Sequence, residues 1–261
     1  MGILRHLICD LDGVVWSGPD LISGSVDALC ALQAEGVSVW FVTNNSNQPP
    51  SHYLDRLAAA GLDHQGQIIT SAQAAATLLE QGQKVLICAG RGVHQAVEEA
   101  GAVPVANVGK CLAEDVDAVV VGLHEDFDYG RLDRASRAVR AGAQLIGTNS
   151  DTTFPTSQGE APGGGAILAA VEAASGQRAV LAGKPNVPMA EALLRRVGST
   201  FDATSTVMVG DRYTTDGRFA EQLGCRFLAV SSGVAPDAVG VPVWERVSSL
   251  GVAVPLLLGA T

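Results

Sequence analysis

Two carboxylates, Asp10 and Asp12, directly follow a short apolar run at residues 6–9 that has the length of a buried strand. Ligands of open α/β sheets bind beyond the carboxyl ends of strands, so this position favours a functional site. Two neighbouring carboxylates repel each other and need a cation or a shared proton. The alternative is an ordinary turn, in which Asp side chains bond to the backbone.

A second pair of carboxylates, Asp211 and Asp216, follows another strand-like run at residues 206–210. If both strand ends lie in one sheet, their oxygens form a site suited to Mg²⁺, a hard cation that uses a few carboxylates together with phosphate and water. The alternative role for Asp211 is to cap the helix expected after residue 213, and that role can coexist with metal binding.

Two further strand ends carry groups that suit an anion. Lys184 lies in a Gly-Lys-Pro turn after the apolar run 179–182 and is one of only three lysines, with Lys84 and Lys110. A cation there would balance carboxylates and hold a phosphoryl oxygen. Thr43 ends the run 37–43, and Asn44 follows it. A hydroxyl, an amide and backbone N–H groups at this position could cradle an anion. The Asn-Asn-Ser sequence that follows is also ordinary turn chemistry.

The elements that must position these side chains alternate along the chain. Apolar runs of strand length are found at residues 7–10, 37–43, 68–70, 84–90, 118–123, 144–149, 179–183, 206–211 and 227–230. Stretches with helical spacing separate them, at 25–36, 51–61, an Ala-rich segment to about 82, a segment to 101, 130–141, 165–176, 188–197 and 214–224. This alternation predicts βαβ units, and the unbroken aliphatic strands indicate parallel sheets covered on both faces.

Composition excludes several classes of protein. The chain has 17 basic and 27 acidic residues and a net charge of −10, without the clustered Lys and Arg of a nucleic-acid or anionic-membrane surface. No apolar stretch is long enough to span a membrane. Five scattered cysteines lack metal or disulfide spacing and are expected to be reduced: Cys9, Cys30, Cys88, Cys111 and Cys225. Charged residues follow the N-terminus too soon for a signal peptide, so we expect a cytoplasmic protein.

In chain order the four segments read DLDGV, VTNN, GKP and GDRYTTD. They resemble the four motifs of the haloacid dehalogenase-like superfamily, and most of all its NagD-like and p-nitrophenylphosphatase-like branch. The strings VGLHEDFDYGRL (121–132) and TNSDTTFPTSQGEAPGGGAILAAVEAASG (148–176) are also similar to that branch. The resemblance implies an α/β fold with a Rossmann-like parallel-sheet core, residues 1–80 and 180–261. A smaller inserted α/β cap, residues 81–179, would lie between the second and third motifs.

The resemblance also implies a Mg²⁺-dependent phosphatase that acts through an aspartyl-phosphate. Asp10 would be the nucleophile, and Asp12 would protonate the leaving group and then activate water. Thr43 and Asn44 would hold the phosphoryl oxygens, and Lys184 would neutralise negative charge. The presence of Asp12 argues against a dehalogenase, because dehalogenases of the superfamily generally lack the second Asp.

Mg²⁺ would be bound by Asp10, by the backbone carbonyl of Asp12 and by Asp211, with Asp216 supporting its outer shell. Thr214 fills a place in the fourth motif that is often acidic in the branch, which leaves both of its aspartates intact. In the cap, His124 stands where many relatives carry Asp, and this puts the transfer of any particular substrate in doubt.

The cap is expected to contribute substrate contacts from Leu123, His124, Asp151 and Phe154, because their strings resemble the substrate-facing loops of the branch. The three glycines at 163–165 lack dinucleotide-binding spacing and are interpreted as a flexible loop between cap and core. Trp16, just after the two aspartates, could belong to a flap over the site or simply pack locally.

The expected substrates are small phosphomonoesters of the phosphoglycolate, glycerol phosphate or sugar phosphate type. The scarcity of aromatic residues, 5% of the chain, gives little to stack a base on. A nucleoside monophosphate phosphatase of the UMP type, or a catalytically silent protein that binds a phosphorylated metabolite, remain alternatives. Proteins similar to this one often form homodimers through the cap, but nothing in the sequence fixes the oligomeric state.

Overall fold

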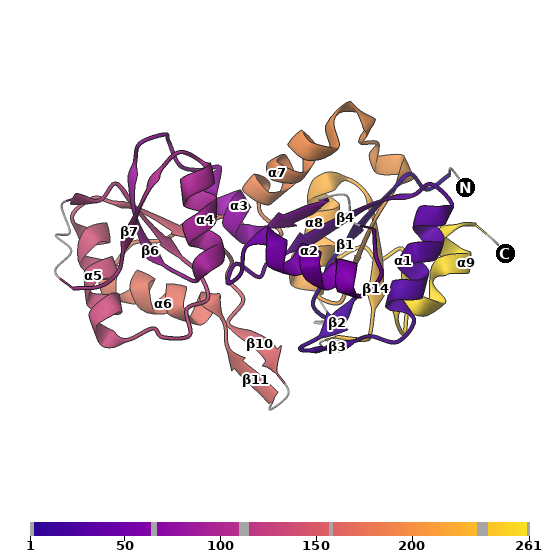
Figure 1. Cartoon of the computed structure of the whole chain (residues 1–261), viewed down its shortest axis with the longest axis horizontal. Coiled ribbons are helices and arrows are strands. Elements are labelled where there is room, and N and C mark those ends of the chain that lie inside the picture. The colour runs from indigo at the N-terminus through magenta and orange to yellow at the C-terminus, as the bar shows by residue number, and fades with distance from the viewer. Residues whose placement is uncertain (1–2, 64–66, 110–114, 157–158, 234–239, 260–261) are drawn as a thin grey trace.

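The computed structural model describes residues 3–63, 67–109, 115–156, 159–233 and 240–259. Its larger sheet has six strands in the order β15-β14-β13-β1-β4-β5, and all neighbouring strands are parallel. The strands are β1 (His6–Cys9), β4 (Ser38–Thr43), β5 (Ile68–Thr70), β13 (Thr206–Gly210), β14 (Arg226–Val230) and β15 (Glu245–Val247). This sheet joins the two ends of the chain, and both termini lie at its side of the molecule (Figure 1).

A smaller sheet of five parallel strands lies beside the first one, in the order β12-β9-β8-β6-β7. Its strands are β6 (Lys84–Cys88), β7 (Val103–Ala106), β8 (Ala118–Val121), β9 (Gln144–Gly147) and β12 (Val180–Leu181). The predicted α/β class with parallel sheets is confirmed. The expected return to the core at residue 180 falls inside β12, which pairs with β9, so the chain leaves the smaller sheet slightly later than expected.

Helices cover both faces of the sheets, as the unbroken aliphatic strands predict. One apolar cluster includes residues of both sheets and of α3, α4, α7 and α8, and a second lies between the larger sheet and α1, α2 and α9. A third cluster packs α5 and α6 on the smaller sheet. The helices are α1 (Ser25–Ala34), α2 (Pro50–Ala59), α3 (Ser71–Ala76), α4 (Arg91–Glu99), α5 (Tyr129–Arg140), α6 (Gly164–Ser175), α7 (Val187–Val197), α8 (Arg218–Leu223) and α9 (Val254–Leu257).

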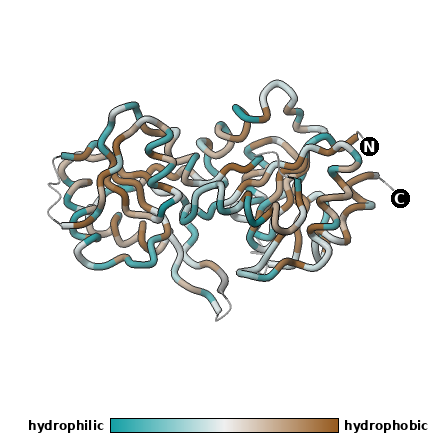
Figure 2. The backbone as a smooth tube through the Cα atoms, viewed as in Figure 1, coloured by the Kyte–Doolittle hydropathy of each residue, from teal (hydrophilic) through white to brown (hydrophobic). Residues whose placement is uncertain are grey.

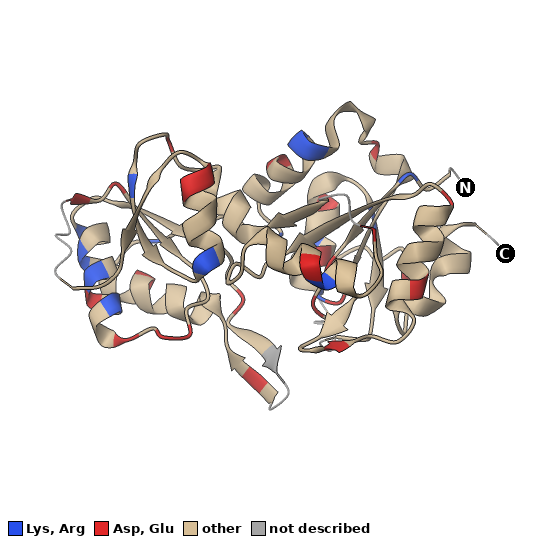
Figure 3. Ribbon diagram, viewed as in Figure 1, with Lys and Arg blue, Asp and Glu red and all other residues tan. Residues whose placement is uncertain are grey.

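The hydropathy of the chain follows this layering. Figure 2 shows hydrophobic segments concentrated in the strands at the centre of each lobe, and Figure 3 shows charged residues mainly on helices and loops. Small aliphatic side chains fill most of the space between sheets and helices, since aromatic residues make up only 5% of the chain. The β-branched and aliphatic strands are therefore buried on both faces, which holds their carboxyl ends in fixed positions.

Two short antiparallel hairpins were not expected from the sequence. β2 (Trp16–Ser17) pairs with β3 (Asp20–Leu21), and β10 (Thr153–Thr156) pairs with β11 (Gly159–Pro162). The second hairpin extends away from the smaller sheet (Figure 1). Hairpins this short lack the alternating pattern over four or more residues by which a strand is recognised.

Two further expectations need correction. The Ala-rich helix ends at Ala76 rather than near residue 82, because the next backbone bonds run from residue i to i−3 and tighten the chain before it enters β6. The three glycines at 163–165 are not a flexible loop but the start of α6. A Cβ on Gly165 would lie 2.3 Å from the Ser150 backbone, so glycine is required there by close packing.

Candidate active site

The functional residues predicted from the sequence meet at one edge of the larger sheet. β1 lies between β13 and β4, so Asp10 after β1 has Asp211 on one side and Thr43 on the other. These carboxyl ends surround a cavity of about 100 Å³. Its lining also includes Asp12, Asn44 and Lys184, and thus combines all four sequence segments. The parallel order of three strands produces this convergence, as open α/β sheets generally do.

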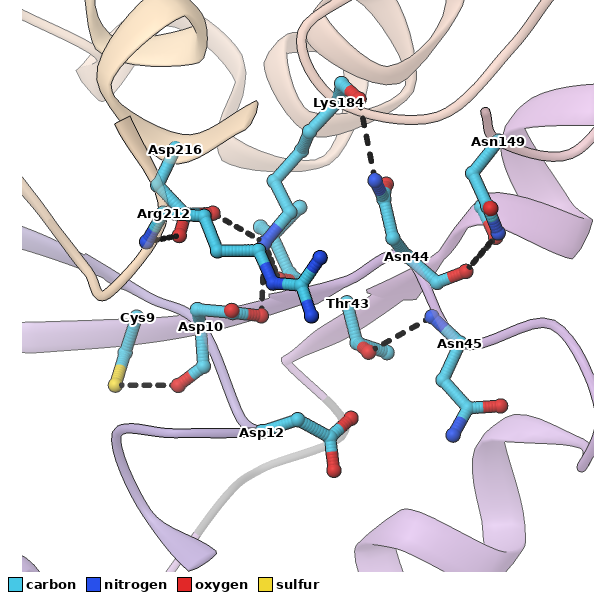
Figure 4. A network of polar contacts seen from close by, with 12 residues as sticks. Cys9, Asp10, Asp12, Thr43, Asn44, Asn45, Asn149, Lys184, Arg212 and Asp216 are labelled. Atoms are coloured by element: carbon cyan, nitrogen blue, oxygen red, sulfur yellow. Dashed lines mark hydrogen bonds and ion pairs between the residues drawn. The ribbon is translucent and has the colours of Figure 1, made fainter. Parts of the chain in front are cut away.

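Lys184 is the central cation of the site. Its side chain is only 1% exposed, and Nζ lies 2.7 Å from Asp10 Oδ1 and 2.7 Å from Asp216 Oδ1 (Figure 4). Nζ also donates a hydrogen bond to the Val42 carbonyl at 2.9 Å. The ammonium group has three protons, so these three acceptors use its full donor capacity. Lys184 therefore joins the strands that carry the aspartates to the end of β4.

Asp216 has a structural role within this network. It lies on a π-helical turn, Tyr213–Gly217, that precedes α8, and is fully buried. One of its carboxylate oxygens accepts from Lys184, and the other accepts from the Arg212 backbone N–H at 3.1 Å. Gly210 makes room for it, because a Cβ there would lie 2.3 Å from the Asp216 side chain. Asp216 thus holds both Lys184 and the turn with its two carboxylate oxygens.

The carboxylates also provide a place for a divalent cation. One carboxylate oxygen of Asp10, one of Asp211 and one of Asp216 lie within 4.8 Å of one another, and all three residues are buried. Gly13 and Gly233 pack directly on the Asp211 carboxylate, where a Cβ on either would lie 2.5 Å or less from Oδ2. A donor set made only of oxygen atoms fits Mg²⁺ better than it fits soft transition metals.

Burial dominates the electrostatics of these groups. It raises the pKa of Asp10 well above its usual range, with Lys184 opposing and Asp216 and Asp211 adding to the effect. Burial lowers the pKa of Lys184, but Asp10 and Asp216 more than offset this, so its pKa lies above its usual range and the amine is charged at neutral pH. Burial also raises the pKa of Asp12, and a hydrogen bond from Trp16 opposes the rise. A bound cation would favour the ionised form of Asp10.

Thr43 and Asn44 lie in the cavity wall beside Asp10. The Thr43 hydroxyl accepts a hydrogen bond from the Asn45 backbone N–H at 3.0 Å. The Asn44 side chain donates to Asp151 Oδ2 at 3.1 Å and to the Lys184 carbonyl at 3.1 Å. Asn44 therefore links the larger sheet to the loop that carries Asp151, which lies between β9 and β10, in addition to lining the cavity.

The structure brings three of the four predicted cap contacts to the cavity and leaves one outside. Leu123, Asp151 and Phe154 line it. His124 instead lies in a neighbouring groove, with Nδ1 2.6 Å from Asp126 Oδ1. Consecutive residues after β8 face different cavities, so the resemblance of the string around them could not separate Leu123 from His124.

The lining also includes residues that the sequence analysis did not assign to the site, among them Asn149, Thr153, Arg212 and Thr215. Arg212 belongs to the quoted string GDRYTTD, so its place in the fourth motif was the available signal. Its guanidinium forms no hydrogen bond or ion pair with any residue that the structure describes, and it reaches toward the centre of the site (Figure 4).

The fold and this constellation define a hydrolase site built on aspartates and a lysine, and comparison with known proteins identifies its family. A model described as haloacid dehalogenase-like hydrolase matches residues 7–103, and a second, HAD-hydrolase-like model matches residues 181–242. The 5′-nucleotidase YutF of Bacillus subtilis is 32% identical over 238 residues, 90% of each chain. The chain belongs to the haloacid dehalogenase-like hydrolase family, as its motifs predicted.

Two further relatives extend this comparison. An acid sugar phosphatase of Staphylococcus aureus is 34% identical over 235 residues, 88% of each chain. The structure of a glycerol phosphate phosphatase from Mycobacterium tuberculosis in complex with magnesium is 32% identical, with a TM-score of 0.84, and the match covers 95% of this chain and 75% of that one. In the part of this chain that the structure describes, none of the helices is long and apolar enough to cross a membrane.

Proposed function

We propose that this protein is a Mg²⁺-dependent phosphatase that hydrolyses small phosphomonoesters through an aspartyl-phosphate on Asp10. The observation that carries the proposal is the buried ion triad in which Lys184 lies 2.7 Å from both Asp10 and Asp216 in the wall of the cavity. A carboxylate that attacks a phosphate dianion needs cations to offset the repulsion, and this arrangement supplies one at the nucleophile.

The chain's own residues divide the reaction into two steps. An oxygen of Asp10 forms a bond to phosphorus while the bond to the leaving oxygen breaks, and Asp12 gives its proton to that oxygen. Water then attacks the aspartyl-phosphate, Asp12 takes a proton from the water, and phosphate leaves with Asp10 restored. Thr43 and Asn44 bind the phosphoryl oxygens, and Lys184 balances charge through both steps.

Asp10, the backbone carbonyl of Asp12 and Asp211 would hold Mg²⁺, while Asp216 supports the site through Lys184. A Mg²⁺ ion bound there would offset negative charge at the phosphoryl group and the nucleophile. The oxygen-only donor set and the magnesium complex of the M. tuberculosis relative support this assignment.

Composition supports a small leaving group, since aromatic residues that could stack on a base make up only 5% of the chain. An acid sugar phosphatase and a glycerol phosphate phosphatase among the relatives favour the same class. The second candidate is hydrolysis of nucleoside monophosphates, which the similarity to a 5′-nucleotidase favours.

We further propose that the unit built on the smaller sheet, about residues 81–179 together with β12, closes over the cavity as a cap. Leu123, Asp151 and Phe154 would then meet the leaving group. Closure would exclude water until the leaving group departs.

Homodimerisation through this unit and a cytoplasmic location are part of the same proposal. The second of these is supported by the cysteines Cys9, Cys30, Cys88 and Cys225, which form no disulfide, while Cys111 lies outside the described residues.

Phosphate release from p-nitrophenyl phosphate and from glycerol phosphate, measured with Mg²⁺ and with EDTA, tests the proposal. Asp10→Asn should reduce kcat by about 10³-fold or more. The matched control Asp20→Asn, on the exposed strand β3, should leave kcat unchanged. Full activity in Asp10→Asn would exclude Asp10 as the nucleophile. A folded wild type that hydrolyses no ester in a broad panel, nucleoside monophosphates included, would favour the silent binding protein.

A further inference from the structure

Trp16 lies immediately beyond the catalytic loop and is completely buried. Its indole Nε1–H donates a hydrogen bond to Asp12 Oδ1 at 3.0 Å. A buried indole N–H generally needs an acceptor, and here the acceptor is the proposed general acid. Local packing was one of the two roles that the sequence left open for Trp16. The hydrogen bond shows that its contact with Asp12 is more than packing.

The backbone between the two residues fixes their separation. The Gly13 N–H donates to the Trp16 carbonyl at 2.7 Å, and the Trp16 N–H donates to the Leu11 carbonyl at 3.2 Å. Trp16 also pairs with Leu21 in the β2–β3 hairpin. These bonds close a tight loop around Asp12, so the indole ring and the carboxyl group are held by the same short segment.

Arg56 holds the indole ring from the side of α2. Its guanidinium carbon lies 4.0 Å from the centroid of the Trp16 ring, and Nη2 donates to the Gly18 carbonyl at 2.7 Å. A cation over the ring face is attracted by the ring quadrupole. Arg56 therefore fastens both the ring and the turn of the hairpin to α2, which restricts rotation of the indole.

Trp40 provides a comparison, because its indole N–H makes no such hydrogen bond in the described structure. Trp40 on β4 packs against the apolar core, and its Nε1 is buried without a hydrogen-bond partner in the described structure. Removing the N–H of Trp40 therefore breaks no contact, whereas removing that of Trp16 releases one oxygen of Asp12.

We propose that Trp16, clamped by Arg56, is a positioning residue that fixes the orientation of the Asp12 carboxyl group. Its N–H occupies Oδ1, so that Oδ2 is the oxygen offered to the leaving group of the substrate. This inference rests on the proposed phosphatase function, and it assigns the Trp16–Arg56 pair a role in both proton transfers of Asp12, to the leaving group and from the water that later attacks the aspartyl-phosphate. The attack by Asp10 does not depend on it.

The leaving group provides the test. The p-nitrophenolate anion is stable and departs without a proton, whereas the alkoxide of glycerol phosphate must be protonated. General acid catalysis contributes about 10²–10⁴-fold, so partial loss of orientation in Trp16→Phe should lower kcat/KM for glycerol phosphate by about 10–100-fold. This ratio reports only the steps up to release of the leaving group, so the same variant should change kcat/KM for p-nitrophenyl phosphate by less than about threefold. Hydrolysis of the aspartyl-phosphate is common to both esters and contributes to kcat, so kcat is not the readout. Trp40→Phe is the matched control and should change neither kcat/KM.

Arg56→Met provides a second variant in case Trp16→Phe does not fold, since it keeps the indole N–H but loosens the ring. It should shift the ratio of the two kcat/KM values in the same direction by a smaller factor. Equal losses of kcat/KM on both esters would mean that Trp16 is merely structural, and an unchanged ratio in every folded variant would overturn the proposal. A wild type that hydrolyses neither ester would instead overturn the proposed function.

Discussion

Replacing Lys184 with methionine would test the electrostatic account of the site most directly. Methionine has a similar length but carries no charge, so Lys184→Met removes the cation and leaves the packing volume nearly unchanged. The carboxylates of Asp10 and Asp216, each 2.7 Å from Nζ, would then lose their ion pair in a buried environment.

Removing one partner of a buried ion pair costs about 3–5 kcal/mol, because an uncompensated charge remains. In this site Asp10, Asp211 and Asp216 lie close together, so their mutual repulsion adds to the cost. We therefore expect Lys184→Met to lose at least about 3 kcal/mol of unfolding free energy in EDTA at pH 7. The double variant Lys184→Met/Asp216→Asn should recover part of that loss without recovering activity.

The loss should depend on pH in a direction that the pKa shifts determine. The pKa of Lys184 is raised, so its contribution is complete at neutral pH and is lost only as pH rises through the raised value. The pKa of Asp10 is raised by burial, so its ionisation destabilises the native state as pH rises above the unfolded value of about 3.9. Without Lys184 this penalty grows, and the deficit of the variant should be larger at pH 8 than at pH 5.

Urea unfolding in EDTA and in excess Mg²⁺, followed by circular dichroism, measures these quantities. Mg²⁺ should restore much of the stability of Lys184→Met, because it supplies positive charge to the same carboxylates. A deficit below about 1 kcal/mol in EDTA at pH 7, or one that does not change between pH 5 and pH 8, would refute the reasoning, since a buried triad would then carry little free energy.

Four other predictions concern three single positions. Gly13 and Gly36 both have positive φ, 87° and 81°, but only a Cβ on Gly13 would strike Asp211, at 2.5 Å. In Gly13→Ala, calorimetry should show Mg²⁺ binding weakened at least about tenfold, while the control Gly36→Ala should lose only about 1 kcal/mol of stability. Equal Mg²⁺ affinities of the two variants would argue against the metal site. Burial raises the pKa of the Cys88 thiol to about 12, so at pH 8 iodoacetamide should modify exposed Cys30 and spare Cys88 in peptide mass spectra, whereas equal labelling of the folded protein would contradict its burial. His124→Gln should keep kcat/KM for glycerol phosphate within about twofold of wild type, and a tenfold loss would return His124 to the substrate site. Burial lowers the pKa of His124, so protonation favours unfolding, and wild type should lose more stability than this variant in urea melts as pH falls below about 6.5.

Much of the fold was predictable because the pattern is local. The aliphatic run that became β13 is buried along its whole length, and the run that became β4 is buried except at Ser38 and Trp40, which are partly exposed. The helix α6 ends at Ser175, and Gly176, with a φ of 75°, forms the left-handed cap that glycine favours. The short hairpins and the early end of α3 could not be predicted in this way. Their bounds depend on where the chain must turn to enter or leave a sheet, and this is a property of packing rather than of periodicity.

The sequence by itself predicted which residues carry the proposed chemistry. The order of its four segments identified Asp10, Asp12, Lys184 and Asp211, and the structure placed their side chains around one cavity. The reason is that residues at the end of a strand can be located in the sequence wherever the strand itself can be predicted from it.

Tertiary structure alone decided how those residues are joined. Lys184 meets Asp216 because the order of the strands brings distant turns together, and the Trp16 N–H meets Asp12 because a tight loop aims it there. His124 faces away from the cavity that its neighbour Leu123 lines. Contacts of this kind depend on strand order and on the direction of each Cα–Cβ bond, which no local pattern of residue types records.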